Sequence, residues 1–306
     1  MINQTIKPIH WIILFTIGAI WGSSFILMKI GLKAMTPLEI AAGRNAAAFL
    51  TSFPFLFAGL KNIPFKDWKF IIIAAYFGSG FPAILYGISS LHLDSSINGV
   101  LNGLTPLFTL VFGVFIFKNN SLKNKYIGVL MGFLGATLLV FSKSHYEIKG
   151  ISLYVLLPIL AASFYGISGN TVKTYLSQYN SFQVTSMLYL FLGIPALTYL
   201  FYAHSFDAID MHAFDWTFWE TKSEVASQEA ASFTAIFILG AFGTAIANFG
   251  FYYLIKKTTV LFGAMTTYII PIIALFWGYV AGEELGASHL FAMLFILVGV
   301  WMVSRK

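Results

Sequence analysis

The chain has 306 residues, of which 58% are hydrophobic and only 10% are charged, and its formal net charge is +6. Since about a quarter of the residues in a soluble domain are charged, this composition excludes an ordinary water-soluble protein. The absence of cysteine also excludes disulfide bonds and thiolate metal sites.

Apolar stretches follow one another along almost the whole chain, and each is close to the ~20 residues that cross a bilayer as a helix. The ten stretches cover residues 11–28, 38–60, 68–91, 96–117, 124–142, 150–172, 182–203, 231–254, 260–281 and 287–304. The first follows Lys7 and has no small-residue cleavage site before the next stretch, so we expect an uncleaved anchor. The sequence therefore predicts an all-α integral membrane protein with ten transmembrane helices.

The positive charge is unevenly distributed between alternate connecting segments. If the N-terminus is cytoplasmic, twelve of the 18 Lys and Arg residues fall on the inner side and five on the outer side, with Arg44 inside the second stretch. Short cytoplasmic loops are enriched in Lys and Arg. We therefore predict a multi-pass protein of the cytoplasmic or inner membrane with both termini in the cytoplasm. This bias accounts for the net charge without a nucleic-acid partner.

The two halves of the chain are similar in sequence. Trp21-Gly22-Ser23-Ser24 matches Tyr165-Gly166-Ile167-Ser168 at an offset of 144 residues, whereas Pro106 matches Pro271 at an offset of 165. Because five spans is an odd number, the second copy must be inverted relative to the first. We predict two inverted five-helix repeats, residues 1–145 and 146–306.

The growth of the offset lies mostly between the seventh and eighth stretches. Residues 204–230 are long and acidic there, whereas their counterpart, residues 61–67, is short. We predict an external acidic insert at 204–230. Its aromatic residues alternate with acids, which is compatible with a segment lying against the membrane interface or with a disordered loop.

Polar and aromatic residues inside the spans are the candidates for a substrate cavity. A buried amide or hydroxyl needs a partner, so each of them either bonds another helix or faces the cavity. The candidates are Trp21, Ser23, Ser24, Arg44, Tyr86, Asn98, Asn102, Tyr165, Ser168, Asn170, Asn248, Tyr252 and Tyr268.

Arg44 is the costliest residue to place, because a guanidinium facing lipid at mid-span costs roughly 2.5–3.5 kcal/mol. It should therefore face the bundle. There it either fixes the helix by bonding carbonyl groups or recognises the carboxylate or phosphate of a substrate.

Pro106 and Pro271 each remove a backbone donor from what the sequence indicates is a helix interior. Freed carbonyl groups in a membrane are tolerated only against protein or a water-filled cavity. Matched breaks in two halves are typical of a transporter binding site. We expect the two prolines to act as hinges or gates, with passive kinks as the alternative.

Several motifs together resemble a known family. The second half carries Gly243-Thr244-Ala245-Ile246-Ala247-Asn248-Phe249, Tyr252-Tyr253, Pro271, Gly282-Glu283-Glu284-Leu285 and Gly299, and the first half carries Trp21-Gly22-Ser23, Arg44, Pro106, Gly128, Gly132 and Gly135. In order and spacing they resemble EamA-type members of the drug/metabolite transporter superfamily. The resemblance implies a ten-helix carrier of small metabolites with a central cavity between inverted repeats.

The chain departs from this family pattern in two places. The Gly-Glu-Glu motif after the ninth stretch is replaced by Lys118-Asn119-Asn120 after the fourth, and the insert at 204–230 is longer than such proteins usually carry. Small relatives exchange protons for cationic drugs through a glutamate in their first helix. The first stretch here contains no acidic residue, so that mechanism is not carried over.

These features predict a secondary transporter that moves a small metabolite, such as an amino acid or a related zwitterion or anion, most simply outwards by alternating access. A polyspecific efflux pump for drugs and cations is the alternative. An intramembrane enzyme is disfavoured, because a His-Glu-x-x-His motif is absent and all six histidines lie at span ends or in loops. We predict no catalytic residue, metal site or cofactor, and as partners only the substrate and the lipid bilayer. The substrate, coupling ion and oligomeric state stay open at this point.

Overall fold

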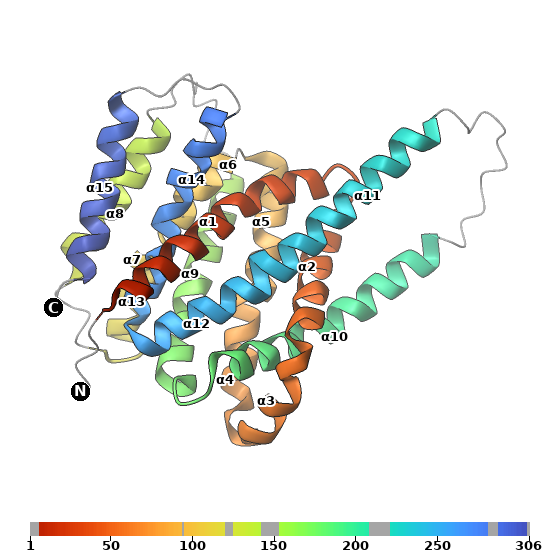
Figure 1. Cartoon of the computed structure of the whole chain (residues 1–306), viewed down its shortest axis with the longest axis horizontal. Coiled ribbons are helices and arrows are strands. Elements are labelled where there is room, and N and C mark those ends of the chain that lie inside the picture. The colour runs from red at the N-terminus through yellow and green to blue at the C-terminus, as the bar shows by residue number, and fades with distance from the viewer. Residues whose placement is uncertain are drawn as a thin grey trace.

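The structure is a computed structural model that describes residues 6–93, 95–119, 125–141, 153–207, 221–280 and 287–304. Regular secondary structure in these residues is helical throughout, and each stretch expected to span the membrane contains helix (Figure 1). The helices of the first half are α1 (Pro8–Gly31), α2 (Pro37–Ser52), η1 (Phe53–Phe55), α3 (Leu56–Asn62), η2 (Phe65–Asp67), α4 (Trp68–Ala75), η3 (Tyr76–Gly80), α5 (Phe81–His92), α6 (Ser95–Asn102), α7 (Thr105–Phe115) and α8 (Tyr126–Phe141). Those of the second half are η5 (Leu153–Val155), α9 (Leu156–Thr171), η6 (Val172–Leu176), α10 (Ser181–Asp207), α11 (Thr221–Gly240), η7 (Ala241–Ile246), α12 (Ala247–Lys257), α13 (Val260–Ala264), α14 (Thr266–Val280) and α15 (Ala287–Ser304).

Five helical stretches within the described residues are long and apolar enough to cross a membrane, namely Pro8–Gly31, Phe65–His92, Leu153–Leu176, Ser181–Ala203 and Gln228–Lys257. Shorter apolar helices accompany them, and large apolar side chains such as Phe115, Phe201 and Phe237 are exposed on the outer faces. Lipid covers such side chains in an integral membrane protein. The count of ten crossings stays a prediction.

Helix boundaries recur between the two halves at the offsets found in the sequence. The helices α2 and α10 begin at Pro37 and Ser181, which are 144 residues apart. The π-helices η3 and η7 begin at Tyr76 and Ala241, which are 165 residues apart. The change of offset therefore falls between the starts of α10 and η7, a range that includes the insert, and this agreement supports the proposed repeat.

The region of the insert is partly helical rather than entirely loop. The helix α10 continues to Asp207 and α11 begins at Thr221, ten residues before the predicted eighth span. Both helices extend beyond the rest of the bundle in Figure 1. The choice between an interfacial segment and a disordered loop concerns residues 208–220, which lie outside the described residues.

The helices α8 and α15 approach each other closely at glycines. A Cβ atom added to Gly299 would collide with the backbone nitrogen of Gly132. In lipid, where helix association depends on packing, small residues permit such backbone contact. The two helices run side by side at one edge of the bundle (Figure 1).

The two prolines occupy different positions, which corrects the expectation of a matched pair of interior breaks. Pro271 lies inside α14, as expected. Pro106 lies in the first turn of α7, where its missing N–H would have no helical partner in any case. The break in the fourth span comes earlier, at residues 103–104 between α6 and α7.

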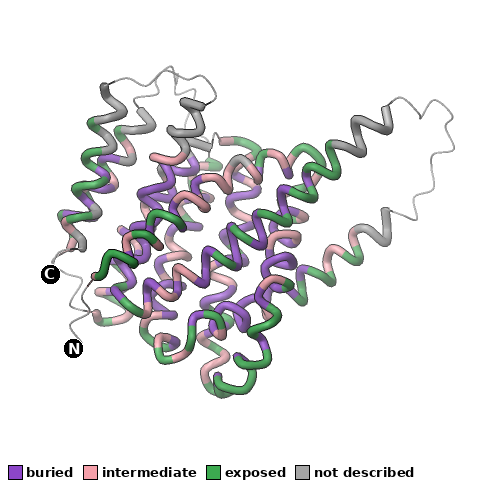
Figure 2. The backbone as a smooth tube through the Cα atoms, viewed as in Figure 1, coloured by how far each residue is buried: buried purple, intermediate pink, exposed green. Residues whose placement is uncertain are grey.

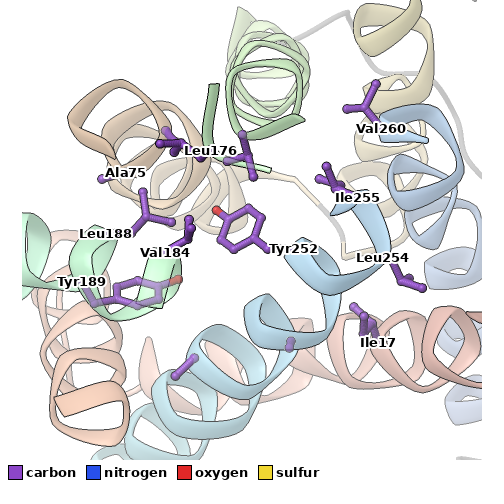
Figure 3. Packing of buried hydrophobic residues seen from close by; sticks show 14 of the residues in the cluster. Ile17, Ala75, Leu176, Val184, Leu188, Tyr189, Tyr252, Leu254, Ile255 and Val260 are labelled. Carbon is purple, nitrogen blue, oxygen red and sulfur yellow. The ribbon is translucent and has the colours of Figure 1, made fainter. Parts of the chain in front are cut away.

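Buried residues lie in the centre of the bundle, and exposed residues are frequent along its outer helices (Figure 2). The main apolar cluster joins residues from both halves of the chain. Within it the ring of Tyr252 lies between Val184 of α10 and Ile255 of its own helix, with Leu176 nearby (Figure 3). This packing fixes α12 beside the central cavity.

Candidate substrate cavity

A cavity of about 840 Å³, counted out to its open mouth, lies among helices of both halves. Its lining combines aromatic rings with hydroxyl and amide groups and includes one charged side chain, that of Arg44, among the described residues. The lining residues are Trp21, Ser24, Phe25, Met28, Arg44, Gly78, Ser79, Tyr86, Asn102, Thr105, Tyr165, Ser168, Gly243, Thr244, Asn248, Phe251, Tyr252, Ala264, Thr267 and Ile270.

Most of the lining comes from equivalent positions of the two halves. At the offset of 144 residues the pairs are Trp21 with Tyr165 and Ser24 with Ser168; at 165 residues they are Gly78 with Gly243, Ser79 with Thr244, Tyr86 with Phe251, Asn102 with Thr267 and Thr105 with Ile270. A cavity built from paired positions is what a site at the interface of two repeats requires.

Arg44 breaks this pairing, because its counterpart at the offset of 144 is Leu188. Its side chain is half-buried, and both Nε and Nη2 donate to the hydroxyl of Thr244 in η7, at 3.2 and 3.0 Å. The five N–H groups of a guanidinium form a planar fork. These contacts occupy its Nε side and leave the outer edge, formed by Nη1 and Nη2, for a ligand.

Glu39, the acid closest to Arg44 along the helix, has a different role. Its carboxylate accepts from the backbone N–H of Thr36 at 2.7 Å, and its own N–H donates to the Thr36 hydroxyl at 3.3 Å. This reciprocal pair is a capping box that starts α2 at Pro37. Glu39 thus stabilises the helix that carries Arg44.

Neutral polar groups of α1, α9 and α12 form another part of the cavity lining. The Asn248 amide donates to the phenol of Tyr189 in α10, and the Ser168 hydroxyl donates to the carbonyl of Ala74 at 2.9 Å. Trp21 donates its indole N–H to the carbonyl of Gly243 at 2.9 Å, and its ring contacts Phe251 at a centroid distance of 5.2 Å. This part of the lining offers aromatic faces and neutral acceptors.

The phenol of Tyr86 is buried and lines the cavity, and its hydroxyl has no hydrogen-bond partner within the described residues. The Tyr86 ring lies nearly parallel to that of Tyr165, with centroids 6.3 Å apart. A buried hydroxyl without a partner is costly, so this group is suited to a polar atom of a ligand.

The cavity therefore contains Trp21, Ser24, Arg44, Tyr86, Asn102, Tyr165, Ser168, Asn248 and Tyr252 of the residues singled out in the sequence. Others pair with neighbouring helices, the alternative that the sequence left open. Asn98 bonds Ser89 and Ser90 of α5, Asn170 donates to the Thr109 carbonyl of α7 at 2.9 Å, and Tyr268 donates to the Val129 carbonyl of α8 at 2.7 Å.

Ser23, Pro106 and Pro271 are also absent from the lining, although Thr105 and Ile270, which precede the two prolines, belong to it. The lining residues that the sequence analysis did not select include Ser79 and Thr244. Both belong to the repeated Phe-Gly-Ser/Thr segment at 77–79 and 242–244, which is a visible signal in the sequence.

Lysine side chains donate hydrogen bonds to backbone carbonyls where two helical segments end, at residues 173–179 and 255–258. The ammonium of Lys173 donates to the carbonyls of Ile255 and Thr258 at 2.7 and 2.6 Å. Lys256 donates to the carbonyl of Tyr179 at 2.8 Å. Together these bonds form a lysine clamp, defined here as Lys173 and Lys256 with the carbonyls they hold.

The phenol of Tyr179 adds a contact to the same end of the bundle, because it donates to the carboxylate of Asp67 at 2.5 Å. Burial, followed by this hydrogen bond, raises the pKa of Tyr179 above its ordinary value. The phenol therefore stays protonated and keeps linking the start of α4 to the start of α10.

The chain matches the model of the EamA-like transporter family twice, over residues 9–141 and 152–305. Similar proteins include an uncharacterized transporter of Archaeoglobus fulgidus, 25% identical over 97% of this chain and 99% of the relative. The uncharacterized inner membrane transporter YedA of Escherichia coli K12 is 23% identical over 95% of this chain and 89% of its own.

Two further likenesses are more limited. A probable amino-acid metabolite efflux pump of Salmonella typhimurium is 25% identical over 59% of each chain. A solved crystal structure covers 97% of this chain and 96% of its own with a TM-score of 0.67 at 17% identity, which shows a shared fold. The chain belongs to the EamA-like transporter family and is an integral membrane transporter.

Proposed function

We propose that this transporter exports a small metabolite that carries a carboxylate, with amino acids and related zwitterions as the first candidates. The observation that carries the proposal is the Arg44 guanidinium, which lines a cavity whose described lining contains no acidic residue, and the contacts of this guanidinium with Thr244 leave its outer edge uncovered. Two parallel N–H groups match the two oxygens of a carboxylate. Export is supported by the relative named as an efflux pump.

The cavity also contains a surface suited to an ammonium group. Its lining offers the rings of Trp21, Phe251 and Tyr252, and aromatic faces attract cations. A zwitterion would therefore lie with its carboxylate at Arg44 and its ammonium at these rings. A lipophilic cation would meet the positive charge of Arg44 with no carboxylate in the described lining to offset it.

For the membrane arrangement we propose ten crossings in two inverted repeats, residues 1–145 and 146–306, with both termini in the cytoplasm. The paired cavity lining and the recurring helix boundaries support the repeat. The lysine clamp supports the orientation, because the positive-inside bias puts basic residues at the cytoplasmic ends of helices. The cavity then alternates between the two membrane faces.

The test is transport in proteoliposomes by the wild type, Arg44→Gln and Arg44→Lys, with labelled amino acids, their amides and ethidium. We expect uptake or exchange of amino acids, loss of this activity in Arg44→Gln, and partial recovery in Arg44→Lys, because a point charge lacks the planar fork. The matched control is Lys61→Gln, which removes an exposed charge outside the cavity. Ethidium transport that survives Arg44→Gln would establish the cation pump instead.

A further inference from the structure

The two π-helices η3 and η7 are equivalent elements that both face the cavity. Both contain a Phe-Gly-hydroxyl segment, Phe77-Gly78-Ser79 in η3 and Phe242-Gly243-Thr244 in η7. In each, the glycine and the hydroxyl residue line the cavity. π-helical turns are rare and occur frequently at functional sites, so their occurrence at one offset in both halves calls for a functional explanation.

Neighbouring residues of α2 bind the two hydroxyls. The Ser79 hydroxyl donates to the Asn45 side-chain oxygen at 3.0 Å, and the Thr244 hydroxyl accepts from Arg44 at 3.0 and 3.2 Å. Through Arg44 and Asn45, one turn of α2 therefore contacts both π-helices. The two contacts differ in charge, because Arg44, which bonds η7, is a cation, whereas Asn45, which bonds η3, is neutral.

The proton of the Thr244 hydroxyl is already committed. It is donated to the carbonyl of Leu239 at 2.9 Å, within the same helical run. The lone pairs of the oxygen consequently point away from that carbonyl and can only accept, which suits the N–H donors of a guanidinium. The backbones of α2 and α11 also lie in close contact here, because a Cβ atom added to Gly240 would lie only 2.6 Å from the Arg44 carbonyl oxygen.

We infer that Thr244 is a positioning residue for Arg44. By accepting from Nε and Nη2 it fixes the rotation of the guanidinium and turns the Nη1–Nη2 edge into the cavity. The inference deepens the proposed function and rests on it, because the edge so presented is the part that would bind the substrate carboxylate. Without the hydroxyl, the fork has no fixed orientation and substrate binding weakens.

The experiment uses the fact that the chain contains two arginines, Arg44 and Arg305. In the full-length protein with Arg305→Lys and ¹⁵N-labelled arginine, a single Nε–H signal reports on Arg44. We expect Thr244→Val to raise the rate of Nε–H exchange with water at least tenfold, and Thr244→Ser to keep it near the wild-type rate, because Ser retains the acceptor. An unchanged rate in Thr244→Val would overturn the inference.

A second measurement in the same background follows ligand binding through Arg44. Phenylglyoxal modifies the guanidinium, and a pool of the amino acids other than arginine, lysine and cysteine, whose side chains react with the reagent, should protect Arg44 from it. Because hydrogen bonds to charged groups are stronger than neutral ones, we expect half-protection to need about tenfold more of the pool in Thr244→Val. Thr244→Ser should need no more than the wild type.

Thr51→Val is the matched control. Thr51 lies in α2, the helix that carries Arg44, and its hydroxyl donates to the carbonyl of Ala47 at 2.8 Å, but it does not line the cavity. It should change neither readout. Failure of the pool to protect Arg44 in the wild type would overturn the proposed substrate class while the Nε–H exchange still decides the role of Thr244. Equal protection in the wild type and Thr244→Val would refute the positioning role alone.

Discussion

The ammonium of Lys173 lies 2.6 Å from the carbonyl oxygen of Thr258, just beyond the C-terminus of α12. A cation there interacts favourably with the negative end of the helix dipole and satisfies carbonyls that have no helical partner. Lys173 lies in η6, which continues α9, so the contact joins this helical run to the end of α12. Both α9 and α12 also line the cavity. The contact therefore links the ends of two helices whose other residues line the candidate substrate site.

Removing this ammonium should favour opening at the lysine end. In the chain with Ala264→Cys, a position on the cavity lining, we expect Lys173→Met to increase labelling by an impermeant maleimide applied from the cytoplasmic side severalfold. The absence of native cysteine makes the readout specific. Lys61→Met, at an exposed position, is the control. Identical labelling with and without Lys173 would show that the clamp does not restrain opening.

The two prolines should differ in their effect on turnover. Pro271→Ala restores a hydrogen bond inside α14, so we expect slower transport at a normal level of folded protein. Pro106→Ala changes the first turn of α7, where the N–H has no helical partner, and should leave turnover close to the wild type. Initial rates in proteoliposomes, normalised to protein content, measure both. Equal slowing in the two variants would contradict this assignment.

Loss of the Tyr86 hydroxyl should separate binding from stability. Tyr86→Phe removes a buried hydroxyl without a described partner, so we expect an unchanged or higher melting temperature together with weaker binding of the substrate. Tyr268→Phe is the matched control, because its hydroxyl bonds Val129 outside the cavity. That change should lower stability by about 1 kcal/mol and leave the KM unchanged. The opposite pattern would remove Tyr86 from the binding site.

The orientation can be tested by a single cysteine at Ser223, in the region between α10 and the membrane part of α11. With both termini in the cytoplasm, this position is external and should react with an impermeant maleimide added outside. The expectation follows from the distribution of lysine and arginine along the chain. Labelling only from the cytoplasmic side would reverse the proposed topology.

Much of the fold was predictable, because the length of an apolar run that crosses a bilayer is a physical constant of the membrane. The apolar stretch of the eighth span begins at residue 231, whereas α11 begins at Thr221, because Lys222, Glu224 and Glu229 interrupt the apolar run without ending the helix. A helix that continues beyond the membrane, however, tolerates such charges. The position of Pro106 was misjudged because the break at residues 103–104 carries only a glycine as its signal.

A residue of the candidate site was predictable where only one environment could satisfy its side chain, and ambiguous where either another helix or a ligand could. Arg44 had to face the protein because lipid does not solvate a guanidinium. Asn98, Asn170 and Tyr268 need partners whether these are helices or ligands, so composition alone did not separate them from Asn102. Thr244 was overlooked because an α-helical periodicity does not anticipate the extra residue of a π-turn.

The extra residue of η3 and of η7 works as an insertion that the helix has absorbed. Each residue of an α-helix turns the chain by about 100°, since 3.6 residues complete one turn. If the same residues of η7 were wound as an α-helix, the extra residue would no longer be absorbed, and α12 would be rotated about its own axis relative to α11 by about that angle. Asn248 and Tyr252, which line the cavity, would then point elsewhere, with the length of the span almost unaltered. The register of one turn thus determines which face of α12 the substrate meets.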